Sequence, residues 1–146
     1  MSDQAATARM HEAMPFCAEL GVRAEKYNAS EVALALDWAP GLCTTNGILH
    51  GGVIMSLADA AGGACTLLNL PQEAAGTATI ESKTNFLGAV RSGTIIATST
   101  PLHVGGTTIV VETAVRDASG RLVAKVTQTQ MVLRQREARS ADRRSG

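Results

Sequence analysis

The sequence predicts an α+β fold in which an antiparallel sheet of five to six strands packs against one long helix. Two short strand-like runs, the second rich in Val, Ala and Leu, precede a single long apolar segment, and four strand-like segments follow it at short spacing. Turn residues separate the later segments, as they do between consecutive antiparallel strands. This order of elements is typical of a sheet that carries one helix.

The chain begins with a polar stretch and a hairpin. Residues 1 to about 12 are mostly polar, and we expect a flexible tail there, with a short helix at most. Segments 21–28 and 31–37 flank an Asn-Ala-Ser turn, which predicts a β-hairpin. Residues 38–47 contain Pro, Asn and Gly and are expected to form a loop.

The one long helix is predicted from about His50 to Leu68. Apolar residues cover nearly its whole circumference, so we expect it to be buried on all sides. A sheet wrapped around one helix is the implied shape. Strands are expected over about 77–88, 93–104, 107–117 and 121–133, with hairpin turns at Gly105-Gly106 and Asp117–Gly120.

Length and composition indicate a single domain over residues 1–146, with an ordered core over about 16–133 and a flexible charged tail over 134–146. Lys plus Arg and Asp plus Glu both number 13, so no overall positive field favours a nucleic-acid partner. No signal peptide and no stretch of about 18 apolar residues is present, which argues against export and membrane insertion.

The three cysteines indicate a reducing compartment. Cys17, Cys43 and Cys65 are odd in number and lack CxxC spacing, which argues against a disulfide framework or a zinc site. We therefore expect a cytoplasmic protein. His11 and His103 are dispersed, so we expect no metal and no cofactor.

Asp59 is unusual because it lies in the middle of the most apolar helix, where an unpaired carboxylate is destabilising. A partly exposed helix face, or a hydrogen bond to a neighbouring element, is the commoner explanation of such a residue. His50-Gly51-Gly52 at the helix start favours a catalytic one, because free N–H groups and the helix dipole there can polarise a carbonyl oxygen. Acyl transfer needs a base or nucleophile together with such donors.

The segment from Gly47 to Ala61 contains His50-Gly51-Gly52 followed by Leu57-Ala58-Asp59. It resembles the HGG(x)nLAD signature of hotdog-fold acyl-CoA thioesterases of the phenylacetyl-CoA-thioesterase-like (PaaI-like) family. The predicted strand order around the helix also resembles this family, over about 16–133. The resemblance implies hydrolysis of an acyl-CoA thioester to a carboxylic acid and free CoA.

By this resemblance, Asp59 is the catalytic carboxylate, acting as general base or as nucleophile. The Gly51 N–H polarises the thioester carbonyl, His50 shapes the turn, and Thr79 is the assisting polar residue on the strand after the helix. Many relatives carry Asn or Gln about six residues before the histidine, where this chain has Thr44. Thr45 and Asn46 are the candidates to replace it.

The resemblance also implies an acyl pocket between facing subunits. Gly62 and Gly63 next to Asp59 leave space there, which indicates a bulky acyl group, and Gly52 and Gly63 are candidates for substrate binding. Lys83, Arg91 and Arg116 are the candidates to contact the CoA nucleotide, although residues of this kind are more often merely solvated charges.

A homodimer is expected, and dimers of dimers are anticipated. Gly51 and Asp59 are separated by about 12 Å along one helix, too far to act on one carbonyl, so a second subunit must supply one of them.

Two alternatives remain open. One is a hotdog hydratase or dehydratase, which would need a different Asp and His pairing. The other is a non-catalytic hotdog protein that binds acyl-CoA.

Overall fold

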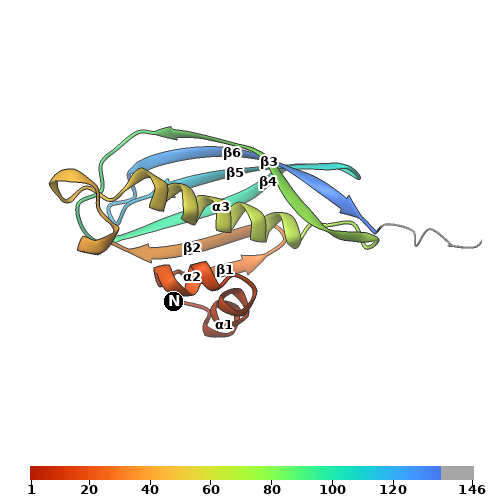
Figure 1. Ribbon diagram of the computed structural model, residues 1–146, viewed down its shortest axis with the longest axis horizontal. Helices are drawn as coiled ribbons and strands as arrows, with labels where there is room; N and C mark the ends of the chain where they lie inside the picture. The colour runs from red at the N-terminus through yellow and green to blue at the C-terminus, as the bar shows by residue number, and fades with distance from the viewer. Residues whose placement is uncertain (136–146) are drawn as a thin grey trace, which may run out of the picture.

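Residues 1–135, the part of the chain that the computed structural model describes, form a six-stranded antiparallel sheet with one long helix on its face (Figure 1). Helices α1 (Gln4–Ala13) and α2 (Pro15–Leu20) precede strands β1 (Arg23–Asn28) and β2 (Glu31–Asp37). Two short 3-10 helices, Pro40–Leu42 and Thr45–Gly47, lead into α3 (Gly51–Leu67). Strands β3 (Ala74–Phe86), β4 (Thr94–Val104), β5 (Thr108–Arg116) and β6 (Leu122–Arg134) follow. The predicted fold class is therefore confirmed.

The strand order in the sheet is β1-β2-β4-β5-β6-β3, so β1 and β3 are its two edges. Strand β3 follows α3 in the chain but pairs with the last strand, β6, at the far edge. Their register sets Thr79 opposite Gln130 and Ser82 opposite Gln128. This topology brings residues from the middle and the end of the chain together under α3.

The core lies between α3 and the face of the sheet that it covers. Strands β5 and β6 alternate buried and less buried residues along most of their length, as expected for a sheet packed on one side. The helix contributes small side chains and the strands contribute aliphatic ones, which allows a close approach of the two layers. The fully buried members include Leu34, Leu36, Leu57, Ala58, Ala61, Ala64, Ile95, Ile109, Val111 and Val115.

Helix α3 is not buried on all sides, contrary to the expectation from its composition. Met55 is 40% exposed and Leu67 is 50% exposed, and Asp59 between them is also exposed. With the partly exposed Gly63, these residues recur every four positions and therefore form one stripe along the helix. The stripe is open because the sheet covers only one side of α3.

The N-terminal residues form a packed helix where a flexible tail was expected. Ala6 and Met10 are each 1% exposed and lie four residues apart, on one face of α1. The Asp3 side chain accepts a hydrogen bond from the Ala6 N–H at 2.9 Å, and the Asp3 N–H donates to the Ala24 carbonyl of β1 at 2.7 Å. Helices α1 and α2 lie beside the β1 edge of the sheet (Figure 1).

A flexible tail was expected over 134–146. Arg134 is instead the last residue of β6, and residues 136–146 lie outside the described part of the chain.

None of the helices within residues 1–135 is long and apolar enough to cross a membrane.

Candidate active site

The first turn of α3 leaves one backbone donor free. His50 is the N-cap, and its Nδ1 atom accepts a hydrogen bond from the Gly52 N–H at 2.8 Å. The Val53 N–H donates to the His50 carbonyl at 2.9 Å. The Gly51 N–H has no acceptor among residues 1–135. Because the positive end of the helix dipole lies here, this N–H is suited to bind a polarised oxygen.

The two glycines of this turn meet different neighbours. A Cβ at position 52 would lie 2.9 Å from Nδ1 of His50, so only glycine lets the histidine cap the helix without a shift. A Cβ at position 51 would lie 3.2 Å from the ring of Phe86, at the end of β3. The Phe86 ring therefore packs against the Cα of Gly51.

Asp59 lies two turns further along the exposed stripe of α3. Its Oδ1 atom accepts a hydrogen bond from Nε2 of Gln128 on β6. Its other carboxylate oxygen, Oδ2, has no donor within the described part of the chain. One side of the carboxylate is thus held by the sheet, and the other is free.

Gln128 and its neighbour Gln130 were not identified from the sequence. They are 0% and 1% exposed, and both project from β6 toward the helix. The alternation of the strand contains the signal, because these glutamines occupy the same face as Val126 and Val132. A polar side chain at a core-facing position indicates a buried hydrogen-bond partner.

A cavity of 320 Å³ adjoins Asp59 within one chain. Its lining comes from α2 and α3 and is apolar apart from Ser56 and Asp59. Burial raises the pKa of the Cys17 thiol in this lining, and the negative charge of Asp59 raises it further. The thiol therefore stays protonated and is not a nucleophile. The lining residues are Met14, Pro15, Phe16, Cys17, Ser56, Asp59 and Ala60.

Thr79 contacts Gln130 and makes no hydrogen bond to Asp59. Its hydroxyl accepts a bond from Nε2 of Gln130 at 2.9 Å, and Oε1 of Gln130 accepts one from the Thr77 hydroxyl at 3.1 Å. Thr79 therefore belongs to the Thr77–Gln130–Thr79 network between β3 and β6, which lies beside the Gln128–Asp59 contact.

The loop before α3 is held by side chains from other elements. The Arg91 guanidinium donates to the Asn46 carbonyl at 2.6 Å, and the Trp38 indole donates to the Gly47 carbonyl at 3.1 Å. Asn46 has a left-handed backbone with φ of 60°. Two predicted site residues, Asn46 and Arg91, therefore meet, while the nearby Thr44 is exposed and its N–H pairs with the Ile48 carbonyl.

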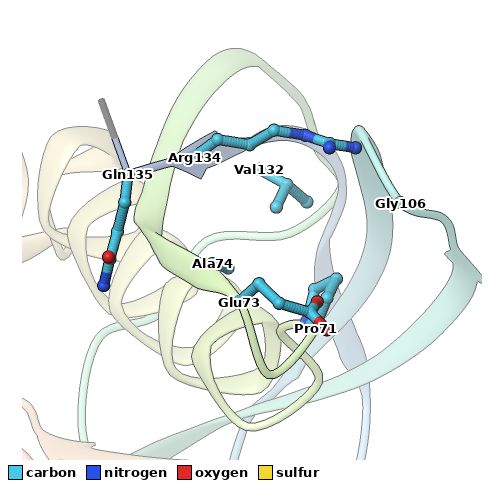
Figure 2. Close-up of a pocket in the computed structure, with 7 residues that line it drawn as sticks. All are labelled: Pro71, Glu73, Ala74, Gly106, Val132, Arg134 and Gln135. Carbon is cyan, nitrogen blue, oxygen red and sulfur yellow. The ribbon is translucent and has the colours of Figure 1, made fainter. Parts of the chain in front are cut away.

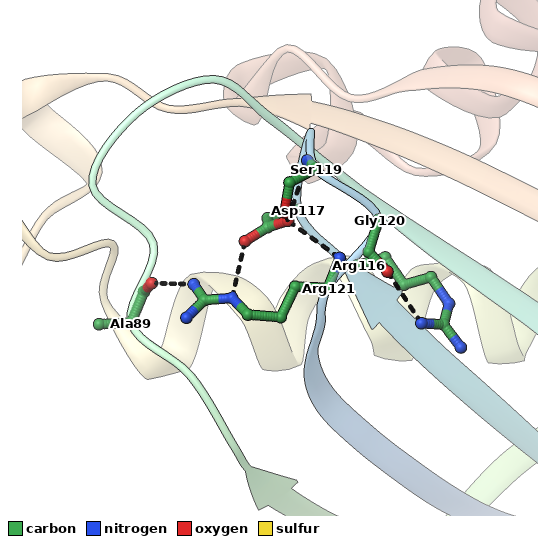
Figure 3. Close-up of polar contacts among 6 residues, drawn as sticks. All are labelled: Ala89, Arg116, Asp117, Ser119, Gly120 and Arg121. Carbon is green, nitrogen blue, oxygen red and sulfur yellow. Dashed lines mark hydrogen bonds and ion pairs between the residues drawn. The ribbon is translucent and has the colours of Figure 1, made fainter.

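The other two predicted basic contacts are engaged separately. The Lys83 ammonium donates to Asn85 at 2.8 Å on β3, and the Arg116 guanidinium donates to the Gly120 carbonyl at 3.0 Å (Figure 3). Arg91 instead lines a surface cavity of 510 Å³ together with Arg121, which the sequence did not single out. Arg121 pairs with Asp117 and donates to the Ala89 carbonyl (Figure 3).

A further cavity of 420 Å³ lies at the opposite end of α3 from His50. Figure 2 shows Glu73 and Arg134 at its rim, with Val132 between them. None of the predicted site residues lines it. Its lining consists of Pro71, Glu73, Ala74, Gly106, Val132, Arg134 and Gln135.

Within residues 1–135, no group of three or more His, Cys, Asp and Glu side chains is arranged to hold a metal ion. The polar side chains that meet near α3 are amides and hydroxyls, together with the carboxylate of Asp59.

Comparison with known proteins identifies the family. The profile of the Thioesterase superfamily matches residues 46–124, more than half of the chain. The chain belongs to this superfamily. It is a thioester hydrolase, and its six-stranded sheet with one long helix is the hotdog fold of the PaaI-like thioesterases.

Individual relatives are similar over most of the domain. A Saccharolobus solfataricus protein named "Putative esterase" is 40% identical over 88 residues, which are 60% of this chain and 61% of that protein. The structure of a Mycobacterium tuberculosis esterase of the same name has a TM-score of 0.81 at 25% identity, covering 85% of this chain and 100% of the other. A mutant of the phenylacetic acid degradation protein PaaI from Thermus thermophilus has a TM-score of 0.75 at 21% identity, covering 82% and 99%.

Proposed function

We propose that the protein hydrolyses acyl-CoA thioesters to a carboxylic acid and free CoA, with Asp59 as general base or nucleophile and the Gly51 N–H as carbonyl donor. The observation that carries the proposal is the arrangement of Asp59. Its carboxylate is held on one side by Gln128, is free on the other, and adjoins a largely apolar cavity of 320 Å³. Such a cavity suits the hydrocarbon part of an acyl group.

The chemistry requires one proton acceptor and one oxyanion donor. In the general-base route, Asp59 takes a proton from water while the water oxygen bonds to the thioester carbon. The carbonyl oxygen gains charge and is stabilised by the Gly51 N–H. The C–S bond then breaks, and the CoA sulfur takes the proton from Asp59 and leaves as the thiol. In the nucleophilic route, Asp59 attacks the thioester carbon and the C–S bond breaks, so that CoA leaves as its thiolate and an anhydride remains. Water then hydrolyses the anhydride to the carboxylic acid and the free Asp59 carboxylate, and the CoA thiolate takes up the released proton.

For the CoA nucleotide, Arg91 is the strongest of the three basic candidates. It contacts the loop that leads into α3 and lines a cavity with Arg121, so two guanidinium groups lie near one opening. Guanidinium groups bind phosphate oxygens well. Lys83 and Arg116 are secondary candidates because neither lines this cavity.

We further propose a homodimer with two composite sites, and dimers of dimers beyond it. The exposed stripe of α3 and the edge strand β3 support this. The β1 edge is bordered by α1 and α2, whereas β3 pairs only with β6. An uncovered edge strand is a template for pairing with a second copy. Twofold pairing with antiparallel helices would bring Gly51 of one protomer near Asp59 of the other. A cytoplasmic location fits the free thiols Cys17, Cys43 and Cys65.

The experiment is a hydrolysis screen of the parent protein and the Asp59→Asn variant with acetyl-, hexanoyl-, palmitoyl-, benzoyl- and phenylacetyl-CoA, measured by thiol release. We expect the parent to hydrolyse at least one of these and the variant to lose about 10²-fold or more of kcat, because the amide cannot act as base or nucleophile. The variant should melt no lower than the parent.

Two results would refute the assignment. A folded Asp59→Asn variant with near-parent activity would remove Asp59 from the mechanism. A large drop in melting temperature would indicate that the carboxylate serves the fold.

A further inference from the structure

The carboxylate of Asp59 has one hydrogen-bond partner in the described part of the chain. Nε2 of Gln128 donates to its Oδ1 atom, which joins the middle of α3 to the middle of β6 across 69 residues of sequence. An amide nitrogen only donates and an ionised carboxylate only accepts. The contact therefore holds Oδ1 and fixes the direction of the second carboxylate oxygen.

Gln128 is an unfavourable residue for this position if stability alone is considered. Its side chain is fully buried, and its Oε1 atom has no hydrogen-bond donor among residues 1–135. A buried oxygen without a donor is destabilising by roughly 1–3 kcal/mol. An apolar side chain of similar size would avoid this penalty, so the benefit of the amide lies in what it does for Asp59.

The helix is shaped to admit this amide. A Cβ at Gly62 would overlap Oε1 of Gln128 and would lie 3.1 Å from its Cδ atom. Any other residue at position 62 would therefore push the end of Gln128 away from its present place. Gly62 lies three residues after Asp59, so the gap and the carboxylate belong to the same turn of α3.

We propose that Gln128 is a positioning residue for Asp59, and that Gly62 provides the space it needs. The proposal rests on the catalytic role proposed for Asp59. Gln128 holds Oδ1, so that Oδ2 meets the substrate or the attacking water in one orientation. Without the amide, the carboxylate can rotate about its own side-chain bonds on the exposed face of the helix.

Gln130 is a matched control on the same strand and the same face. It is 1% exposed, and both its amide atoms have partners in the hydroxyl groups of Thr77 and Thr79. Gln130 thus bonds the two strands together, whereas Gln128 bonds to Asp59 alone. Replacing each with leucine removes one buried amide from the same face of β6.

The experiment compares Gln128→Leu and Gln130→Leu with the parent, using the best CoA thioester of the screen. For Gln128→Leu we expect kcat to fall about 10- to 100-fold because the carboxylate is misplaced, with KM within about twofold of the parent. Its melting temperature should stay equal or rise, because the unpaired Oε1 is gone. For Gln130→Leu we expect a lower melting temperature, because the Thr79 hydroxyl loses its partner and the Thr77 hydroxyl keeps only the Met131 carbonyl.

The split between kcat and KM, read beside the melting temperature, is the readout that a structural role would not produce. In Gln128→Leu we expect kcat to fall while KM and the melting temperature hold, whereas in Gln130→Leu we expect the melting temperature to fall.

A third variant tests the contact while keeping both side chains. Gly62→Ala should lower kcat in the parent background by displacing Gln128, and should cause no further loss in the Gln128→Leu background. An additive loss in the two backgrounds would contradict the proposal.

The proposal is overturned if a folded Gln128→Leu variant keeps the kcat of the parent while Asp59→Asn is inactive. In that case the catalytic role of Asp59 survives and only the positioning role fails. If Asp59→Asn is itself active, both fail together.

Discussion

At the scale of single residues, His50 determines which backbone donors at the start of α3 have a partner. Its ring accepts the Gly52 N–H and its carbonyl accepts the Val53 N–H, so among residues 1–135 the Gly51 N–H is left without an acceptor. Nδ1 of His50 can accept the Gly52 N–H only while this ring nitrogen carries no proton. The donor that we assign to the thioester carbonyl is thus a product of how the helix is capped.

Two substitutions at Gly51 separate the N–H from the space around it. Gly51→Ala and Gly51→Pro both add a Cβ against the Phe86 ring, but only proline removes the N–H. Proline is compatible with the first helical position, and the extended backbone of His50, with φ of −62° and ψ of 134°, accepts a following proline.

We expect kcat/KM of Gly51→Pro to be lower than that of Gly51→Ala by about 10²-fold, the size of effect typical of one lost oxyanion donor. Steady-state kinetics on both variants, with matching circular dichroism spectra, measure this. Equal losses in the two variants would show that crowding of Phe86 is responsible.

At the scale of elements, the turn between β5 and β6 is held by one carboxylate. Asp117 accepts hydrogen bonds from the backbone and side chains of Ser119 and Arg121 (Figure 3). The Ser119 hydroxyl is the largest cause, and with Arg121 it lowers the pKa of Asp117 from 3.8 to about 2. A depressed pKa means that the stabilising effect is complete above the unfolded pKa and disappears as the pH falls toward the folded value.

We therefore expect Asp117→Asn to melt below the parent at pH 6, and the difference in melting temperature to shrink as the pH falls from about 4 toward 2. Thermal unfolding followed by circular dichroism at pH 6, 4 and 3 measures the trend. A difference that stays constant over this range would mean that the charge of Asp117 does not hold the turn.

The same scale shows what sequence patterns can and cannot predict. Alternation and turn residues predicted each strand to within three residues, because a half-buried strand must repeat every second position. The prediction that α3 is buried on all sides was wrong. Met55 and Leu67 are apolar, which suggested burial, but no element within residues 1–135 covers the stripe that they occupy. The contact between Asp59 and Gln128 was missed because it depends on the order of strands in the sheet, which local patterns do not encode.

At the scale of the whole molecule, the two groups that must act on one carbonyl are separated along a single helix. Gly51 and Asp59 are about 12 Å apart along the axis of α3. The tilt of side chains toward the helix N-terminus closes only part of this distance. A site made by one chain is therefore incomplete in our proposal, and the partner chain completes it.

Mixed dimers test this directly. Co-expression of Asp59→Asn with Gly51→Pro, under two purification tags, yields dimers with one intact composite site and one doubly defective site. We expect about half of the parent activity per dimer, although each mutant homodimer is nearly inactive. A mixed dimer as inactive as its parents would show that each site lies within one chain. Re-purification after the assay checks that subunits have not exchanged.

The place of β3 at the far edge of the sheet also determines when the site can form during synthesis. Strand β3 pairs only with β6, so neither of its edges has a partner until the chain has been made to about Arg134. Until then, a 13-residue strand with exposed Ile80 is open to mispairing with other chains. The Asp59 to Gln128 bond closes a loop of 69 residues, a long-range contact of the kind that slows folding. A ribosome that stops before β6 would therefore release a chain that has its helix and its carboxylate but lacks the amide that orients it.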